Sequence, residues 1–466
     1  MPSNQALSAQ DSVFLELEAS GVPMHIGAML VFDGGSLRDA NGACDLGTVR
    51  SVLESRLHRA EKTRWRVQKV PFSGRYVWVD DDRFRLDYHL RHIALPAPGS
   101  RAQLDAIGSD FFSRGLDLTR PLWEILVVDG LENGHLAALC KFHHAMIDGL
   151  AGVELLNLLL RVEPSRESES PSSWEARRAP GPRELAQEEA ERRVGLARSA
   201  ARGLLDAVRN PSASLATTRE HALGIAHTLR AIASPSSRLS FNEAIGSSRS
   251  VERFRVELDE FKTIKRRFGG TINDLVLALV AGGLRRYLRA HDWDPDELQA
   301  RALIPVSTRS DLDHSGLGNK IAVVVSELPV AEPDPLRRLE AVCRASDQTK
   351  SSRQALGTEL VTHLAEWTAP ALLTQTLLLS TRMRAANLMV TNIRGPGVPL
   401  YVLDAPLLEV YPVAELWPEQ GLNVAVFSYA GFLHFGVNAD PDIVEDVGDF
   451  CALMREEFAE LAKLAA

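Results

Sequence analysis

A polar, charged segment near the middle of the chain constrains the fold most, because it cannot belong to a hydrophobic core. From residue 163 to about residue 213 the sequence is rich in Ser, Pro, Glu, Arg and Ala, as in EPSRESESPSSWEARRAPGPRELAQEEAERR. The early part is typical of a mobile linker and the later part of an exposed, charged helix. The chain has 466 residues, whereas single cores stop growing at roughly 250–300 residues. We therefore predict a first domain over residues 1–162, a partly helical linker over residues 163–213 and a second domain over residues 214–466.

Composition excludes several classes of protein. Hydrophobic residues make up 45% of the chain and charged residues 24%, which is ordinary for a soluble globular protein. The net charge of −9 argues against a nucleic-acid-binding protein, which usually has a basic face. The 4 cysteines form no CxxC pair, so we expect neither a structural metal site nor a disulfide framework. Residues 1–20 lack a signal-peptide pattern, and no apolar run reaches the length of a membrane span. These features indicate a soluble or peripheral protein of the reducing cytoplasm.

Each half of the sequence contains a hairpin that leads towards a helix. In the first half, apolar-rich runs over residues 123–128 and 135–144 flank the turn dipeptide Asn133-Gly134. In the second half, runs over residues 424–429 and 432–437 flank Ala430-Gly431. Further strands are expected over residues 27–32, 76–79, 254–258, 301–306 and 321–328, and helices over residues 12–18, 46–60, 272–288 (capped by Thr271, with Asp274 at the third helical position), 336–376 and 450–464. The fold class is therefore α/β or α+β with mixed sheets.

The segment His143-His144-Ala145-Met146-Ile147-Asp148-Gly149 lies where the first hairpin ends and a helical pattern begins. Side chains alternate along a strand, so the two histidines are expected to point to opposite sides, and only one can face a given channel. An imidazole titrates at about pH 6.5 and can accept a proton at neutral pH. Asp148 can receive backbone N–H groups or pair with an arginine, and Gly149 suits a tight turn. The pattern favours a general base, which contributes roughly 10²- to 10⁴-fold in rate.

Three other interpretations of this segment compete with general-base catalysis. A metal site is disfavoured because helical zinc motifs place two histidines on one face, whereas these two are adjacent. Cys140 as a nucleophile is disfavoured because it lies about 13 Å from His144 at the rise of a strand. Two histidines that are merely hydrogen-bonded at the end of a strand would be the favoured interpretation without the Asp-Gly pair.

The HHAMIDG segment resembles the HHxxxDG signature of acyl-CoA-dependent acyltransferases and non-ribosomal peptide condensation domains. An ordered set of further elements is similar to the bacterial wax ester synthase/diacylglycerol acyltransferase family, from about Asp11 to Leu461. These elements are DSVFLELE and PMHIGAMLVF in the opening segment, Pro121-Leu122-Trp123, Thr271-Ile272-Asn273-Asp274, Pro305-Val306-Ser307, Gly318-Asn319 and Asn392-Ile393-Arg394-Gly395-Pro396. One position departs from the family, because Arg394 stands where a proline is common.

This resemblance implies two chloramphenicol-acetyltransferase-like domains with mixed sheets and flanking helices, joined by a linker and lining a central channel. It implies transfer of a long-chain fatty acyl group from acyl-CoA, as a cosubstrate and without another cofactor, to diacylglycerol or a fatty alcohol. The reaction would take place in the cytoplasm, in solution or at the surface of a membrane or lipid inclusion. Two alternatives stay open: another enzyme of the HHxxxDG superfamily with a different alcohol or amine acceptor, and a non-catalytic lipid-surface protein that kept the fold. The sequence does not set the oligomeric state.

The resemblance also implies roles for single residues. His144 would deprotonate the acceptor hydroxyl, His143 would support the loop, and Asp148 would be chiefly structural. Asn273 would either donate to a developing oxyanion or simply order the start of a helix. The remaining candidate positions are Gly149 in the motif, Pro121 and Trp123 as architectural residues, Glu18 at the channel, Ser307, Asn319 and Asn392 in the matched elements, and Arg309, Lys320 and Arg394 as either contacts to CoA phosphates or solvated cations.

Overall fold

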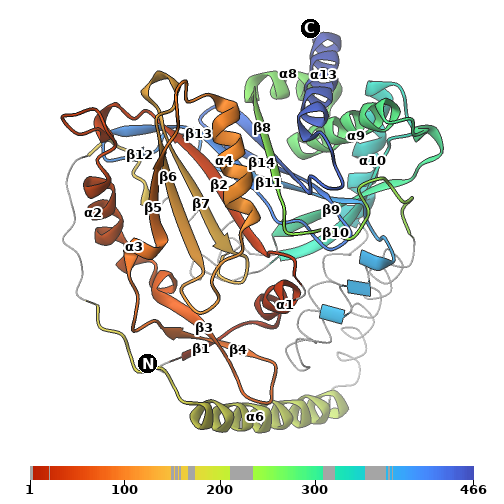
Figure 1. Ribbon diagram of the computed structural model, residues 1–466. Coiled ribbons are helices and arrows are strands. Elements are labelled where there is room, and N and C mark those ends of the chain that lie inside the picture. Colours follow the sequence, from red (N-terminus) through yellow and green to blue (C-terminus); the bar gives the residue numbers. More distant parts are fainter. Residues whose placement is uncertain are drawn as a thin grey trace.

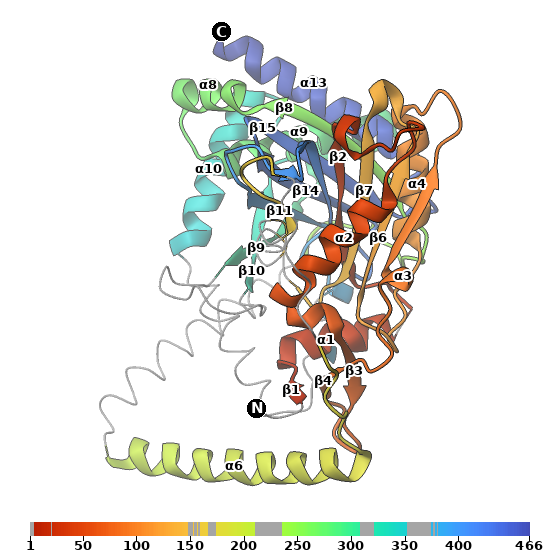
Figure 2. The same cartoon turned by 90° about the vertical axis from the view of Figure 1, so that its left-hand side faces the viewer.

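The computed structural model describes residues 4–19, 21–147, 152, 156, 159–165, 174–209, 235–307, 321–351, 374–375, 378–379 and 381–466. Within these ranges the chain forms two six-stranded sheets and one three-stranded sheet. The two large sheets lie next to each other, with helices on their outer faces (Figure 1). Figure 2 shows the same arrangement from the side, with the helix α6 (Pro182–Arg209) running along one edge of the molecule.

The first large sheet carries the hairpin that ends in the two histidines. Its strands are all antiparallel to their neighbours except for the outer pair β5·β6, which is parallel. In spatial order they are β12 (Tyr401–Val402), β13 (Ala405–Val413), β2 (His25–Phe32), β7 (Leu136–His143), β6 (Trp123–Asp129) and β5 (Leu90–Ala94).

The second large sheet is mixed. Its central strand β11 pairs in parallel with both neighbours, and the outer pairs are antiparallel. The spatial order is β10 (Ile321–Leu328), β9 (Ala300–Ser307), β11 (Leu388–Arg394), β14 (Leu422–Tyr429), β15 (Phe432–Ala439) and β8 (Ser250–Glu257). A small third sheet has the order β1 (Asn4–Ala6), β4 (Tyr76–Asp80) and β3 (Trp65–Lys69).

Two strands from the second half of the sequence complete the first sheet. β13 pairs with β2 over most of its length, and β12 extends this edge, so blue strands lie beside red and yellow ones in Figure 1. β13 also passes close to β15, where a Cβ on Gly436 would lie 1.8 Å from the carbonyl oxygen of Pro412. The predicted domain boundaries stay a prediction. The linker does not separate the strands of one sheet from those of the other, because the second half supplies β12 and β13 to the first sheet and all six strands of the second.

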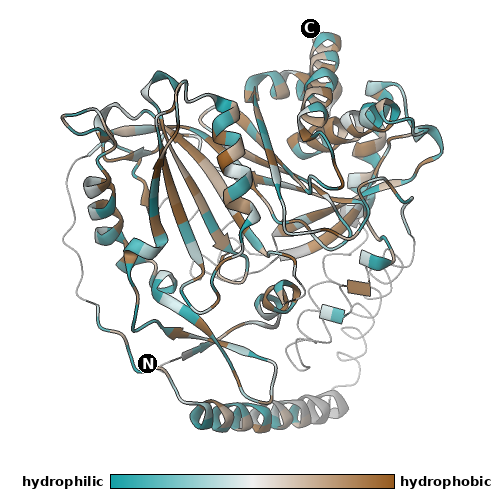
Figure 3. Cartoon of the chain, in the orientation of Figure 1, coloured by the Kyte–Doolittle hydropathy of each residue, from teal (hydrophilic) through white to brown (hydrophobic). Residues whose placement is uncertain are grey.

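Helices cover the large sheets on both sides. α4 (Arg101–Ser113) packs Phe111 and Phe112 against one face of the first sheet, and α2 (Leu46–Arg56) packs Val52 and Leu53 against the other. The apolar strands of both sheets are brown in Figure 3, whereas teal residues recur along α6. α6 touches the small sheet through Leu185, which packs against side chains of β4. The later part of the linker is thus a charged helix, as predicted.

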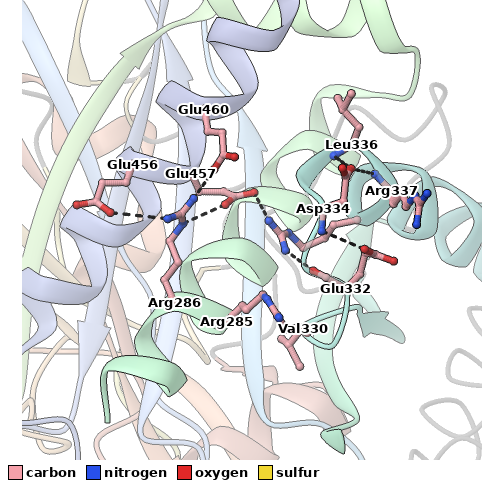
Figure 4. Close-up of polar contacts among 11 residues, drawn as sticks. Arg285, Arg286, Val330, Glu332, Asp334, Leu336, Arg337, Glu456, Glu457 and Glu460 are labelled. Carbon is pink, nitrogen blue, oxygen red and sulfur yellow. Dashed lines mark hydrogen bonds and ion pairs between the residues drawn. The ribbon is translucent and has the colours of Figure 1, made fainter. Parts of the chain in front are cut away.

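Four helices flank the second sheet, and a buried ionic network joins three of them (Figure 4). Glu457 accepts from Arg338 at 2.6 Å and from Arg286 at 3.2 Å. Gly282 allows this close packing, since a Cβ there would lie 2.2 Å from the Glu457 carboxyl carbon. The four helices are α8 (Leu258–Phe268), α9 (Ile272–Ala290), α10 (Pro335–Ser351) and α13 (Val447–Ala465). Two further helices are α1 (Ala9–Glu18) and the short α3 (Leu86–His89).

Most predicted elements of the described ranges are present. Both hairpins form, and Thr271 and Asp274 make the predicted capping box at the start of α9. The helix predicted after Gly149 and most of the region after residue 351 lie outside the described residues. The structure adds β1, β3, β5, β11, β12, β13, α4 and α8, none of which the sequence patterns predicted.

In the part of the chain that the structure describes, no helix is both long enough and apolar enough to cross a membrane. The 4 cysteines are free thiols. The described residues also contain no group of three or more His, Cys, Asp or Glu side chains that could hold a metal ion.

Candidate active site

The end of β7 is held by backbone hydrogen bonds on both sides. His143 closes the strand opposite His25 of β2, and its N–H donates to the carbonyl of Leu122 at 2.9 Å. The next N–H, that of His144, donates to the carbonyl of Met24 at 2.9 Å. Leu122 belongs to the Pro121-Leu122-Trp123 element, so this element fixes the position at which the strand ends.

The ring of His143 has both nitrogens engaged. Its Nδ1 accepts the N–H of Ala145 at 3.0 Å, and its Nε2 lies 2.5 Å from Oε2 of Glu18. Because Nδ1 is an acceptor, the proton is on Nε2, which donates to the Glu18 carboxylate. The side chain of His143 is 0% exposed. Both ring nitrogens of His143 are therefore engaged within the protein, and its role in supporting the loop stays a prediction.

The ring of His144 is in a different environment. It stacks on Phe14 with ring centroids 4.0 Å apart and an interplanar angle of 16°. Its Nε2 lies 3.7 Å from Oε1 of Glu415, and the side chain is 11% exposed. Of the two adjacent histidines, His144 is thus the one whose ring is less completely buried, and its role as general base stays a prediction.

Helix α1 contacts both histidines. Phe14 and Glu18 are four residues apart and lie on one face of the helix, where Phe14 meets His144 and Glu18 meets His143. The expectation that the two rings point to opposite sides rests on strand alternation, and it stays a prediction. The strand ends at His143, and His144 is already in a turn, so strand alternation no longer applies.

Glu415 is a functional candidate that the sequence did not indicate. It lies between β13 and β14 and is buried, with a side chain 4% exposed. Trp417 Nε1 donates to its Oε1 at 3.0 Å, and Asn423 Nδ2 donates to its backbone carbonyl at 3.0 Å. No local motif marks a single glutamate as the neighbour of a histidine in another half of the chain, so only the three-dimensional fold could have found it.

Three ionisable side chains near the end of β7 are buried, and burial shifts the pKa of each of them. Burial lowers the pKa of His25 to about 3, and its Nε2 donates to the carbonyl of Phe112 at 2.8 Å. Burial also lowers the pKa of Lys141 to about 8, and the Lys141 ammonium donates to the carbonyl of Phe111 at 3.1 Å. Burial raises the pKa of Cys140 to about 12, so this thiol is not a thiolate at neutral pH. The geometry gives no support to a cysteine nucleophile.

Two predicted residues of the second half come together. Asn273, in the first turn of α9, accepts from Nδ2 of Asn392, near the end of β11, at 3.5 Å. This contact turns the Asn273 carbonyl towards β11 and leaves its Nδ2 to donate elsewhere. The neighbouring Arg394 is exposed, and a Cβ on Gly395 would lie 2.3 Å from the ring of Phe427. The turn is therefore tightly packed at Gly395. Arg394, which stands where the family commonly has a proline, is exposed to solvent.

The architectural candidates are buried. Trp123 donates its Nε1–H to the carbonyl of Thr63 at 2.8 Å and stacks on His89. Pro121 is buried as well, and Ser307 closes β9 opposite Ile321. Asp148, Gly149, Arg309, Asn319 and Lys320 lie outside the described residues, so their roles stay predictions.

Comparisons with known proteins show which family the chain resembles over nearly its whole length. A family model for the wax ester synthase/diacylglycerol acyltransferase catalytic domain matches residues 7–276, and one for the WS/DGAT C-terminal domain matches residues 317–462. The O-acyltransferase WSD of Acinetobacter baylyi is 30% identical over 454 residues, which cover 96% of this chain and 94% of the relative. A probable diacylglycerol O-acyltransferase of Mycobacterium tuberculosis is 31% identical over 472 residues, covering 98% of this chain and 96% of the relative.

Solved structures share the fold. The wax ester synthase/diacylglycerol acyltransferase from Marinobacter aquaeolei VT8 matches with a TM-score of 0.69 and 23% identity, over 99% of this chain and 100% of that chain. The first condensation domain of the calcium-dependent antibiotic synthetase matches with a TM-score of 0.61 and 18% identity, over 99% of this chain and 96% of that chain. The predicted fold of two chloramphenicol-acetyltransferase-like domains with mixed sheets is confirmed.

Proposed function

Because the chain belongs to the wax ester synthase/diacylglycerol acyltransferase family, we propose that it is an O-acyltransferase that moves a long-chain acyl group from acyl-CoA to diacylglycerol or a fatty alcohol, with His144 as general base. The observation that carries the assignment of the base is the contrast between two adjacent rings. Both nitrogens of His143 are used and its side chain is fully buried, whereas the ring of His144 stacks on Phe14 and keeps a small exposed fraction. Proton abstraction from a hydroxyl group requires an imidazole that is held in place and that the acceptor can approach.

The reaction balances without an acyl-enzyme. Nε2 of His144 accepts the proton of the acceptor hydroxyl while the hydroxyl oxygen forms a bond to the thioester carbonyl carbon. The carbon–sulfur bond then breaks, and the proton passes from His144 to the departing CoA thiolate. The products are an ester and free CoA thiol, and His144 returns to its starting state.

The other residues of the proposed site either position His144 or stabilise the negative charge that develops on the substrate oxygen. Glu18 holds the proton-bearing Nε2 of His143, and His143 in turn accepts the N–H of Ala145, so this pair shapes the turn that carries His144. Asn273, with its carbonyl engaged by Asn392, is the candidate donor to the oxygen of the tetrahedral intermediate. A donor of this kind, when removed, typically costs roughly 10²- to 10³-fold in kcat.

The proposal includes acyl-CoA as cosubstrate and a membrane or lipid-inclusion surface as the place where the apolar acceptor is met. Phe72, at the tip of the hairpin β3–β4, is fully exposed and could enter such a surface. Flotation with diacylglycerol-containing vesicles tests this part: the wild-type chain should float with the vesicles, and a chain that stays at the bottom at every vesicle concentration would contradict it.

The activity itself is tested by CoA thiol release from palmitoyl-CoA with the lipid products identified. Diacylglycerol, hexadecanol and hexadecylamine are offered separately, because the amine tests the alternative acceptor class. We expect triacylglycerol or wax ester from the wild-type chain, and neither product from His144→Ala. His92→Ala, which changes an exposed histidine on β5, is the matched control and should keep the wild-type rate. Formation of the amide alone, or of no lipid product, would overturn the proposed function.

A further inference from the structure

We propose that Phe14 is a positioning residue of this active site, whose phenyl ring sets the plane of the His144 imidazole. This inference rests on the proposed function, because a positioning role requires His144 to take part in proton transfer. Its starting point is the stack between the two rings, whose centroids are 4.0 Å apart and whose planes differ by 16°.

The stack restrains the torsion that turns the imidazole about its bond to Cβ. The preferred angles of this torsion are broad and only roughly two-fold, so the torsion alone does not hold the ring in one plane. A flat ring packed against one face restricts the rotation, because turning the imidazole would push its edge into the phenyl ring. Both nitrogens lie on that edge, so the contact with Phe14 sets the plane in which they point.

The position of Phe14 is set by its own helix. Glu18 accepts from Nε2 of His143 at 2.5 Å, and Glu16 accepts from the hydroxyl of Tyr76 at 3.1 Å. Glu16 and Glu18 are two residues apart on α1, which places them on different sides of the helix, about 200° apart around its axis. Turning α1 about its axis would therefore break one of these bonds, and the helix holds Phe14 against the ring of His144.

The second half of the chain supports the phenyl ring as well. The side chain of Phe14 is buried, and Trp417, on the connection between β13 and β14, packs edge-on against it with ring centroids 6.4 Å apart and planes at 77°. Aromatic rings favour this edge-to-face arrangement. The indole N–H of Trp417 donates to Oε1 of Glu415 at 3.0 Å, which holds the indole in place. Both halves of the chain thus contribute to the surface on which the His144 ring packs.

A second stack in the first half of the chain offers a matched comparison. Phe84 stacks on His89 with ring centroids 5.3 Å apart and an interplanar angle of 20°. His89 is buried, and its Nδ1 donates to the carbonyl of Trp123 at 2.7 Å. Phe84→Leu therefore removes the same kind of ring from a histidine that has no part in the proposed reaction.

The test compares Phe14→Leu with Phe84→Leu in ester formation from palmitoyl-CoA and whichever of diacylglycerol and hexadecanol the wild type esterifies. A misplacement of about 1 Å can cost roughly a hundredfold in rate, so we expect kcat of Phe14→Leu to fall roughly ten- to hundredfold with KM little changed. Phe14→Tyr keeps a flat ring and should recover most of this loss, and Phe84→Leu should match the wild type. Thermal unfolding shows which variants are folded, and Phe14→Met replaces Phe14→Leu if the latter is not. Wild-type kcat in a folded variant without the ring, or a rise in KM alone, would overturn the role of Phe14.

A second readout does not depend on turnover. The ring current of a phenyl group moves the resonances of protons over its face upfield. The imidazole resonances of His144, assigned by their absence in His144→Gln, therefore report the stack by NMR at one fixed pH. They should move downfield in Phe14→Leu and keep the wild-type position in Phe84→Leu. If the wild type makes no ester but the resonances move, the proposed function fails and the contact stands. If they do not move in folded Phe14→Leu, the rings do not stack in solution and the inference is overturned.

Discussion

The hairpins β6–β7 and β14–β15 end in opposite ways. The first, β6–β7, is followed directly by His144, and the second, β14–β15, is followed directly by Asp440. Asp440 is fully buried, and its two carboxylate oxygens accept backbone N–H groups from Gly246 at 2.6 Å and Asp442 at 3.0 Å. Its own N–H donates to the carbonyl of Gly421 at 3.0 Å. The end of the second hairpin is therefore closed by main-chain partners.

The end of the first hairpin depends on side chains from distant elements. Glu18 and Phe14 come from α1, and Glu415 comes from the connection after β13. Backbone N–H groups thus satisfy the carboxylate of Asp440, whereas the ring of His144 stacks on Phe14 and has Oε1 of Glu415 3.7 Å from its Nε2. The same hairpin-to-loop frame thus serves stability in one sheet and chemistry in the other.

The largest effect should come from removing the carboxylate of Asp440, which follows the hairpin β14–β15. Asp440→Ala removes the carboxylate that accepts the backbone N–H groups of Gly246 and Asp442, and a hydrogen bond contributes about 0.5–1.5 kcal/mol net, so the free energy of unfolding should fall by roughly 1–3 kcal/mol. The kcat per folded molecule should stay at the wild-type value, because this residue belongs to the second hairpin. Denaturant unfolding and active-site-normalised kinetics measure the two quantities. A variant of full stability with reduced kcat would reverse the comparison.

A smaller effect is expected when the hydrogen bond between Glu18 and His143, at the end of the first hairpin, is weakened. Glu18→Gln replaces a charge-assisted bond to His143 by a neutral one, which is roughly half as strong. We expect kcat to fall about tenfold, with a small change in the melting temperature. Glu16→Gln is the control on the same helix, since Glu16 accepts from Tyr76 instead of a histidine. Equal kinetics in the two variants would show that the Glu18–His143 pair does not position the base.

The smallest effect concerns acid stability near β7. Burial lowers the pKa of His25 to about 3 in the folded chain, whereas the ordinary pKa of a histidine is 6.5. Between these values the unfolded chain binds more protons than the folded one, so stability falls as the pH drops from 6.5 towards 3. His25→Gln keeps a donor for the carbonyl of Phe112 and removes this titration, so its melting temperature should depend less on pH below 6.5. An unchanged pH dependence would mean that other groups dominate acid unfolding.

Short sequence patterns predicted the structural elements that residues close together in the chain determine. The hairpins, the capping box of Thr271 and Asp274, and the position of His144 at a strand-to-loop junction follow from short segments. α4 could also have been predicted, because Ser100 and Gln103 form a capping box at its start. β13 was hidden because its segment contains Pro406 and Pro412, which argue against an inner strand.

The candidate site was predictable only in part. The HHxxxDG motif and Glu18 could be picked out from the sequence because they match family elements. The different contacts of the His143 and His144 rings could be found only in the structure. The pairing of Asn273 with Asn392 joins the start of α9 to β11, and Glu415 approaches His144 from the connection between β13 of the first sheet and β14 of the second. Such contacts join residues far apart in the chain, and no periodicity or spacing within one segment encodes them.

The central claim is that His144, and not the neighbouring ring, takes the proton from the acceptor hydroxyl. The most direct measurement is kcat for ester formation by His144→Ala at saturating palmitoyl-CoA, with thermal unfolding recorded on the same preparation. The account predicts a fall of roughly 10²- to 10⁴-fold while the melting temperature stays close to that of the wild type. Ester formation at the wild-type rate by folded His144→Ala would contradict it.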